Sequence, residues 1–160
     1  MIIVSDTSPI NYPVLIREIE LLPQLFGGVV IPQAVLDELQ QTGTPEAVKD
    51  WVDSRPQWLE IQNAKAIDQT IALGAGEREA ILLAKELNAD LVLIDDRKAR
   101  RAAVERGLNV AGTINILESA AKRGLVNLTE AFQKPEQTNF RIAPDLLNLA
   151  KAFLLLNAIH

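Results

Sequence analysis

The sequence predicts one α/β domain, a three-layer α/β/α sandwich around a central, mainly parallel sheet. The chain has 160 residues, of which 48% are hydrophobic and 23% charged, and this length is enough to bury a sizeable core. Runs at 29–31 and 91–94 are apolar throughout, as in strands of a parallel sheet that are buried on both faces. Helical patterns of about ten residues separate the apolar runs, as expected for successive βαβ units.

Polar residues, prolines and glycines divide the first half of the chain. The apolar run at 2–4 is interpreted as a strand, and after it Ser8 suits a helix N-cap and Pro9 the first helical position. Two consecutive glycines break the chain before the β-branched strand at 29–31. Further helices are predicted at 13–20, at 21–26, from Pro32 to the residue before Thr42, and from Thr44 to about Asp53.

The second half repeats the alternation of strands and helices. A glycine-rich loop at 73–79 leads into a helix with apolar residues at helical spacing, and glycines end the two helices that follow. We expect one domain at 1–128 and, after a linker at 133–139, a helical extension within 129–160 that packs on the same domain. Strands are predicted at 58–61, 91–94 and 109–111, and helices at 80–87, 99–106, 113–123 and 144–158.

The composition excludes several kinds of chemistry. There is no cysteine, which excludes disulfide scaffolds, zinc ribbons and thiol catalysis, and the single histidine, His160, is the last residue, where a frayed terminus cannot position an imidazole. A net charge of −5 argues against a broad basic surface that coats nucleic acid. No apolar run approaches the roughly 20 residues that cross a bilayer. We therefore expect a cytoplasmic protein, without membrane contact, whose chemistry depends on carboxylates.

Four acidic residues are predicted to converge at one edge of the sheet. Asp6 follows the first predicted strand and Asp95 a later one, and ligands of parallel sheets bind at the strand ends where the strand order reverses. Glu38 lies in the helix after the strand at 29–31, and Glu77 lies where the glycine-rich loop enters the next helix, so both can lean over the same edge. Ligands that are all oxygen suit Mg²⁺ or Mn²⁺. One or two such ions can activate a water and stabilise the leaving oxyanion of a phosphodiester.

Each of these acids, taken alone, has a simpler interpretation. Asp6, within the segment DTSP, is typical of a turn or a helix cap, and Asp95 or Asp96 of a cap for the helix that follows. Glutamates in helices, such as Glu38 and Glu79, are solvated by default. The second acid at a strand end favours the shared site over these separate roles.

The densest positive charge of the chain follows the last acids directly. It consists of Arg97, Lys98, Arg100 and Arg101. Such a run is usually a solvated helix face, but its place beside the proposed metal ligands favours phosphate binding. We expect Arg97, Arg100 or Arg101 to hold substrate phosphates. No aromatic residue is interleaved with the run, which argues against base stacking.

Taken together, these residues resemble the PIN domain, the nuclease fold of VapC-type toxins from toxin–antitoxin systems. They are similar in particular to a branch of PIN-domain nucleases that begins with SDTSP. The resemblance covers roughly residues 1–128, and the ordered set of segments is more specific than any single motif. The matching segments are 4–9, 22–27, 31–32, 35–38, 76–81, 93–97, 99–100, 112–113, 122–125 and 140–142.

The resemblance implies an acidic site that binds one or two Mg²⁺ or Mn²⁺ ions and cleaves RNA. Carried over residue by residue, Asp6 matches the first-strand aspartate, Glu38 the helix glutamate and Asp95 the acid after the later strand. The third acid is commonly aspartate in VapC-like toxins. Here it is Glu77 or Glu79, and the choice between them stays open.

Three polar residues stand beside these acids. Asp96 is either an extra metal ligand or only a cap. Thr7 and Ser8 are expected to hydrogen-bond the first acid or a metal-bound water.

We therefore predict a metal-dependent endoribonuclease of PIN type, either the toxin of a toxin–antitoxin pair or a related orphan nuclease. It would hydrolyse RNA phosphodiesters with a metal-activated water, and its expected partners are RNA, an antitoxin protein and a second copy of the chain. The alternative is a PIN-like module of little activity that binds RNA or protein. A receiver domain needs a lysine after its last strand, and a haloacid-dehalogenase phosphatase needs a second aspartate where Ser8 stands, so both are set aside.

Overall fold

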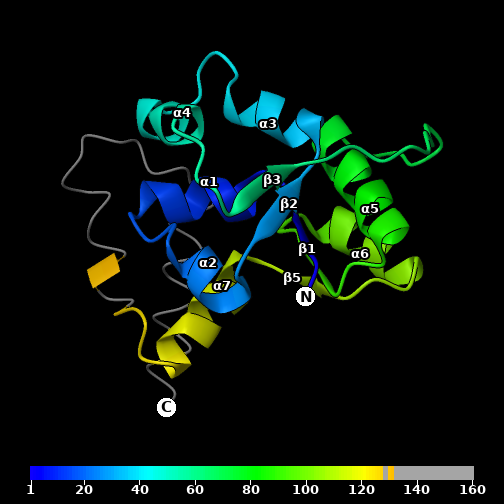
Figure 1. The fold of residues 1–160 in the computed structure, drawn as a ribbon. Helices are drawn as coiled ribbons and strands as arrows, with labels where there is room; N and C mark the ends of the chain where they lie inside the picture. Colours follow the sequence, from blue (N-terminus) through cyan, green and yellow to red (C-terminus); the bar gives the residue numbers. More distant parts are fainter. Residues whose placement is uncertain (128–129, 132–160) are drawn as a thin grey trace.

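A computed structural model of the chain describes residues 1–127 and 130–131 (Figure 1). Among these residues, none of the helices combines the length and the apolar character that a membrane crossing requires. The strands are β1 (Ile3–Ser5), β2 (Val29–Ile31), β3 (Leu59–Ile61), β4 (Leu91–Leu93) and β5 (Val110–Ala111). The helices are α1 (Ser8–Leu15), α2 (Leu21–Phe26), α3 (Gln33–Leu39), α4 (Glu46–Asp53), α5 (Ala75–Leu87), α6 (Arg97–Glu105) and α7 (Thr113–Lys122).

The five described strands form one sheet in the order β3-β2-β1-β4-β5. Every pairing is parallel, and β1 lies at the centre, with Val4 opposite both Val30 of β2 and Val92 of β4. From β1 the chain builds outward first through β2 and β3, and then on the other side through β4 and β5. The strand order therefore reverses between β1 and β4, which is where ligands bind in parallel sheets.

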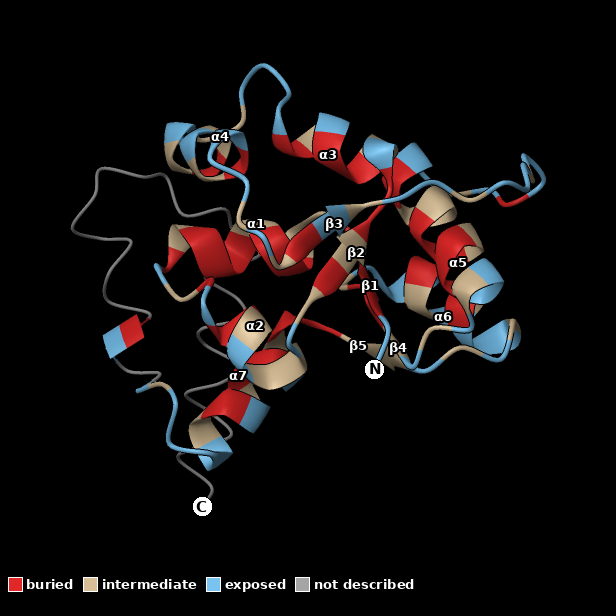
Figure 2. Ribbon diagram, in the orientation of Figure 1, coloured by how far each residue is buried: buried red, intermediate tan, exposed pale blue. Residues whose placement is uncertain are grey.

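Helices cover both faces of this sheet, which confirms the predicted α/β/α sandwich. Successive strand residues point to opposite faces. Ile3 and Leu93 pack in one core cluster with α1, α2, α3, α4 and α7, and Val4 and Val92 pack in a second cluster with α5 and α6. Figure 2 shows buried residues in the strands and on the inner sides of the helices. The fold holds the ends of β1 and β4 between two packed layers.

Most predicted elements are present within a few residues, but the first helix differs. It begins at Ser8, with Thr7 as the capping residue and without a side-chain capping bond, and it ends at Leu15. The predicted start at Pro13 is wrong, because Pro13 lies inside α1, where it cannot donate a backbone hydrogen bond and its ring crowds the preceding turn. The segment up to Glu20 is not continuous helix, since Arg17 adopts a left-handed φ of 60°.

The helix of the basic run also begins earlier than predicted, at Arg97 instead of Ala99. Asp96 caps it, and its Oδ2 accepts a hydrogen bond of 2.9 Å from the backbone N–H of Ala99. The predicted linker at 133–139 and the predicted helix at 144–158 lie outside the described residues.

Candidate active site

The carboxyl ends of β1 and β4 bring Asp6 and Asp95 to the same edge of the sheet. The backbone N–H of Asp6 donates to the carbonyl of Leu93 at 2.9 Å, and that of Ile94 donates to Ala111 at 2.9 Å. These bonds continue the sheet past the ends of the strands. The expectation that the two aspartates follow neighbouring strands is therefore met.

Asp6 is buried, with 5% of its surface exposed. Its Oδ1 has no hydrogen-bond partner among the described residues. Burial, and to a smaller extent the charges of Glu77, Glu38 and Asp95, raises the pKa of the Asp6 carboxyl to about 7, against the backbone hydrogen bond from Thr7. The four acids predicted to form one site are therefore close enough to act on one another electrostatically.

Glu38 lies in α3 and joins three elements through its carboxylate. It accepts a hydrogen bond from the hydroxyl of Thr7, which follows β1, and one of 3.2 Å from the backbone N–H of Gly76 in α5. A Cβ added at Gly76 would lie 2.7 Å from both carboxylate oxygens of Glu38. Glycine is needed at this position because the carboxylate approaches the backbone closely.

Glu77 lies in the first turn of α5. Burial raises its pKa, as do the charges of Asp96 and Glu38, against a backbone hydrogen bond at Gly74 and the charge of Lys98. Glu79 instead lines a separate cleft of about 220 Å³. Of the two candidates for the third acid, the structure brings Glu77 beside Asp6 and does not bring Glu79 there.

Asp95 is held by Thr113, a fully buried residue that sequence reasoning did not single out as part of the site. The Thr113 backbone N–H donates to Oδ1 at 2.5 Å and its hydroxyl to Oδ2 at 2.6 Å. Burial raises the pKa of Asp95, against these bonds and the charge of Arg100. Thr113 follows β5 much as Asp6 follows β1, so the rule of strand ends was the signal that could have found it.

The remaining predicted residues surround these acids. Arg97 and Arg101 are exposed on α6. Arg100 is half-buried, and a Cβ at Gly112 would lie 2.7 Å from its Nη1 and 2.8 Å from Oδ1 of Asp95, so Arg100 lies beside Asp95 and not in open solvent. Asp96 acts as a helix cap, and Ser8 is the half-buried first residue of α1.

The chemistry of the donors fits a divalent cation that prefers oxygen ligands. Among residues 1–127 and 130–131, no three acidic side chains already stand close enough to share one ion. Four carboxylates nevertheless act on one another here, and the buried Oδ1 of Asp6 lacks a partner within the described part of the chain. A buried acceptor without a partner is costly, and a bound cation would satisfy it.

Comparison with known proteins finds a matching family model and a similar solved structure. A family model described as a PIN domain matches residues 2–154. Among solved structures, a PilT N-terminus domain protein from the hyperthermophilic archaeon Sulfolobus solfataricus P2 is similar, with a TM-score of 0.57 and 22% sequence identity, covering 75% of this chain and 93% of that chain. At that identity the likeness shows the fold alone. No curated protein matches the chain.

Proposed function

We propose that this chain, which belongs to the PIN domain family, typically a family of nucleases, is a metal-dependent endoribonuclease. One observation carries the proposal beyond the family. The buried Oδ1 of Asp6 lacks a partner among the described residues at the point where the charges of Glu38, Glu77 and Asp95 act on it. In the proposal these four acids hold one or two Mg²⁺ or Mn²⁺ ions. A divalent cation bound there supplies the activation of water and the neutralisation of charge on the phosphate oxygens.

The chain's own residues prepare this site. Thr7 and Gly76 orient the Glu38 carboxylate, and Thr113 orients Asp95, through hydrogen bonds that are donated to the acids. Such bonds hold ligands in place and reduce the reorganisation needed when substrate arrives. With a pKa of about 7, the Asp6 carboxyl still holds a proton for much of the time at neutral pH. It gives up this proton when the site binds a cation.

The substrate and the biological role are part of the same proposal. The exposed guanidinium groups of Arg97 and Arg101 suit contacts to the RNA backbone. The segments at 4–9 and 93–97 resemble those of VapC-type toxins, so we infer either the toxin of a toxin–antitoxin pair or an orphan nuclease of that kind.

The test is the cleavage of a mixed RNA pool by pure protein with Mn²⁺, Mg²⁺ or EDTA. We expect cleavage with a cation, none with EDTA, and a loss of about a thousandfold in Asp6→Asn and in Asp95→Asn. Asp37→Asn removes an exposed carboxylate of α3 next to Glu38 and serves as the matched control that retains activity. A folded wild type that cleaves under none of these conditions would favour the alternative, a module that binds RNA or protein.

A further inference from the structure

An open cleft of about 520 Å³ adjoins the candidate active site at Glu77, one of the four acids. Gln69 and Leu73, in the segment between β3 and α5, line one side. Asp96 and Lys98, at the start of α6, line another, and Glu77 of the acidic site lines it as well. Its volume lies within the roughly 300–1,000 Å³ of clefts that hold small ligands. A strand of nucleic acid at the acids would therefore also reach this cleft.

The segment between β3 and α5 is a fixed wall of the cleft. In Figure 1 it loops outward beside the start of α5. Ile71 in this segment is only 4% exposed, and Leu73 packs against the core cluster of α5 and α6. The guanidinium Nη1 of Arg78 donates to the carbonyl of Leu73 at 3.4 Å, which ties the segment to α5. Ile71 and Leu73 thus anchor this wall of the cleft to the core, while Gln69 beside them is exposed.

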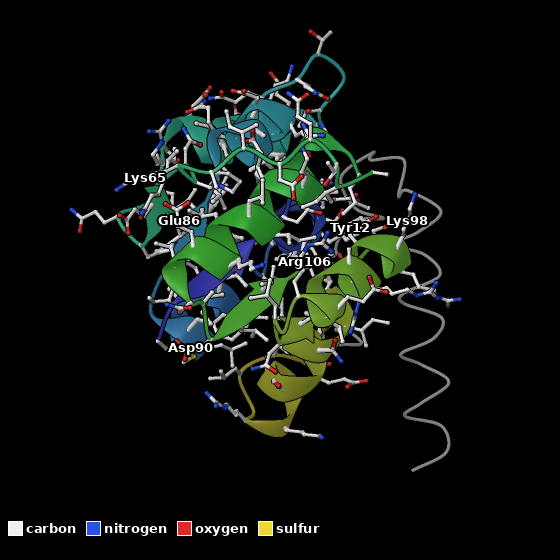
Figure 3. All side chains as sticks on the ribbon, turned by 90° about the vertical axis from the view of Figure 1, so that its right-hand side faces the viewer. Tyr12, Lys65, Glu86, Asp90, Lys98 and Arg106 are labelled. Atoms are coloured by element: carbon white, nitrogen blue, oxygen red, sulfur yellow. The ribbon has the colours of Figure 1, made fainter. Side chains whose placement is uncertain are left out.

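Two cations line the cleft beside the acids, Arg78 and Lys98. Lys98 is exposed, and its side chain extends from the start of α6 in Figure 3. It lies close enough to Glu77 for their charges to interact. Within the described part of the chain its ammonium group makes no hydrogen bond or ion pair. No aromatic side chain of the described residues lines the cleft, so a ligand there is held through charge and hydrogen bonds.

We infer that this cleft binds the nucleotide next to the scissile phosphodiester, with Lys98 holding its phosphate and Arg78 and Gln69 offering donors to its sugar or base. The inference rests on the proposed function, because the acids define where the scissile bond lies. It also distinguishes Lys98 from its neighbours, since Arg97 and Arg101 belong to the same helix but do not line the cleft. A lysine in a cleft that is also lined by Glu77, an acid of the proposed metal site, suits two successive phosphates, one held directly and one through a metal.

The experiment compares Lys98→Gln with Lys122→Gln. Both variants remove one charge from an exposed lysine of a helix, and Lys122 lies in α7, away from the cleft. RNA cleavage is measured with Mn²⁺, and affinity for the same RNA is measured in EDTA over a range of salt. We expect Lys98→Gln to raise KM about tenfold with kcat within about twofold. The slope of log affinity against log salt should fall by about one, and Lys122→Gln should change none of these quantities.

The outcomes separate this inference from the proposed function. If the wild type cleaves RNA and Lys98→Gln matches Lys122→Gln in KM, affinity and salt slope, the subsite is overturned and the nuclease stands. If the wild type binds RNA through Lys98 without cleaving it, the nuclease is overturned, and the cleft stands as an RNA-binding site that is not part of a catalytic centre. Absence of both cleavage and binding by the folded wild type overturns both. Gln69→Ala on the opposite wall is a second variant, and a change in the preferred cleavage sites supports the same subsite.

Discussion

The ends of β1 and β4 carry two aspartates that the fold treats differently. Asp95 is half-buried and accepts two hydrogen bonds from Thr113. Asp6 is more deeply buried, and its Oδ1 has no partner among the described residues. Burial raises the pKa of both carboxyls, but at Asp95 the bonds from Thr113 and the charge of Arg100 oppose the rise. At one strand end the protein's own groups thus satisfy the carboxylate, and at the other a buried carboxylate oxygen has no hydrogen-bond partner among the described residues.

The largest expected effect on stability comes from Asp6. Its folded pKa of about 7 lies above its ordinary value of 3.8, so between these pH values the folded state keeps a proton that the unfolded state has lost. The free energy of unfolding of the metal-free protein should therefore fall as pH rises from about 4 to about 7, by roughly 3 kcal/mol, and level off above. Asp6→Asn should remove most of this slope and be the more stable protein at pH 8. Urea unfolding in EDTA between pH 4 and 9 measures both.

The same measurement with Mn²⁺ sharpens the comparison. A cation that completes Asp6 stabilises the folded state by mass action, and it competes with the proton, so its stabilising effect should grow from pH 5 to pH 8. Asp6→Asn should lose that gain. If the free energy of unfolding of the metal-free wild type rose with pH across this range, the raised pKa of Asp6 would be contradicted.

A smaller effect on stability is expected when Asp95 loses one of its two hydrogen bonds from Thr113. Thr113→Val keeps the shape and the backbone N–H but removes the hydroxyl bond to Oδ2. We expect a loss of about 1–2 kcal/mol in the free energy of unfolding, and a higher pKa of Asp95, seen as an upward shift of the acidic limb of the pH–rate profile. Thr113→Ser keeps the hydroxyl and should retain both properties. Equal behaviour of the valine and serine variants would mean that the hydroxyl does not position Asp95.

The rule that polar residues gather at strand ends explains how much of the candidate active site could be predicted from the sequence. It located Asp6 and Asp95 from sequence, because each follows an apolar run, and the parallel order of β1 and β4 brings them together. The same rule applies to Thr113, which follows the strand predicted at 109–111, but a threonine neither titrates nor carries a charge, so the search for carboxylates did not select it. Pro13 misplaced α1 because proline usually begins a helix.

The cleft beside the acids was not predictable at all. Its outer wall is a segment without helical or strand periodicity, at 62–74, anchored by isolated apolar residues such as Ile71. Patterns of spacing carry no information about such a segment. The pairing of Glu38 with Gly76 was hidden for a similar reason, because a close approach between a helix and a carboxylate depends on packing between elements that are far apart in sequence.

The smallest effect on stability is expected at Gly76, whose N–H binds the Glu38 carboxylate. Gly76→Ala places a Cβ only 2.7 Å from both carboxylate oxygens of Glu38, so the carboxylate has to move. Stability should change by less than about 1 kcal/mol, because the end of a flexible side chain can move and alanine favours helix. RNA cleavage should fall about 10- to 100-fold. A displacement of the Glu38 carboxylate by less than about 1 Å is enough to disturb catalysis.

Gly74→Ala is the matched control for this variant. Gly74 precedes α5 by one residue, and a Cβ there would meet only Oε2 of Glu77 at 4.0 Å, an ordinary contact, so activity should be retained. If Gly76→Ala cleaved RNA like the wild type, the position of Glu38 would not depend on its close approach to α5, and the hydrogen bond from Thr7 would be enough to orient it. If the variant lost activity with its stability intact, the orientation of Glu38 would be as much a part of the site as the charge of Asp6.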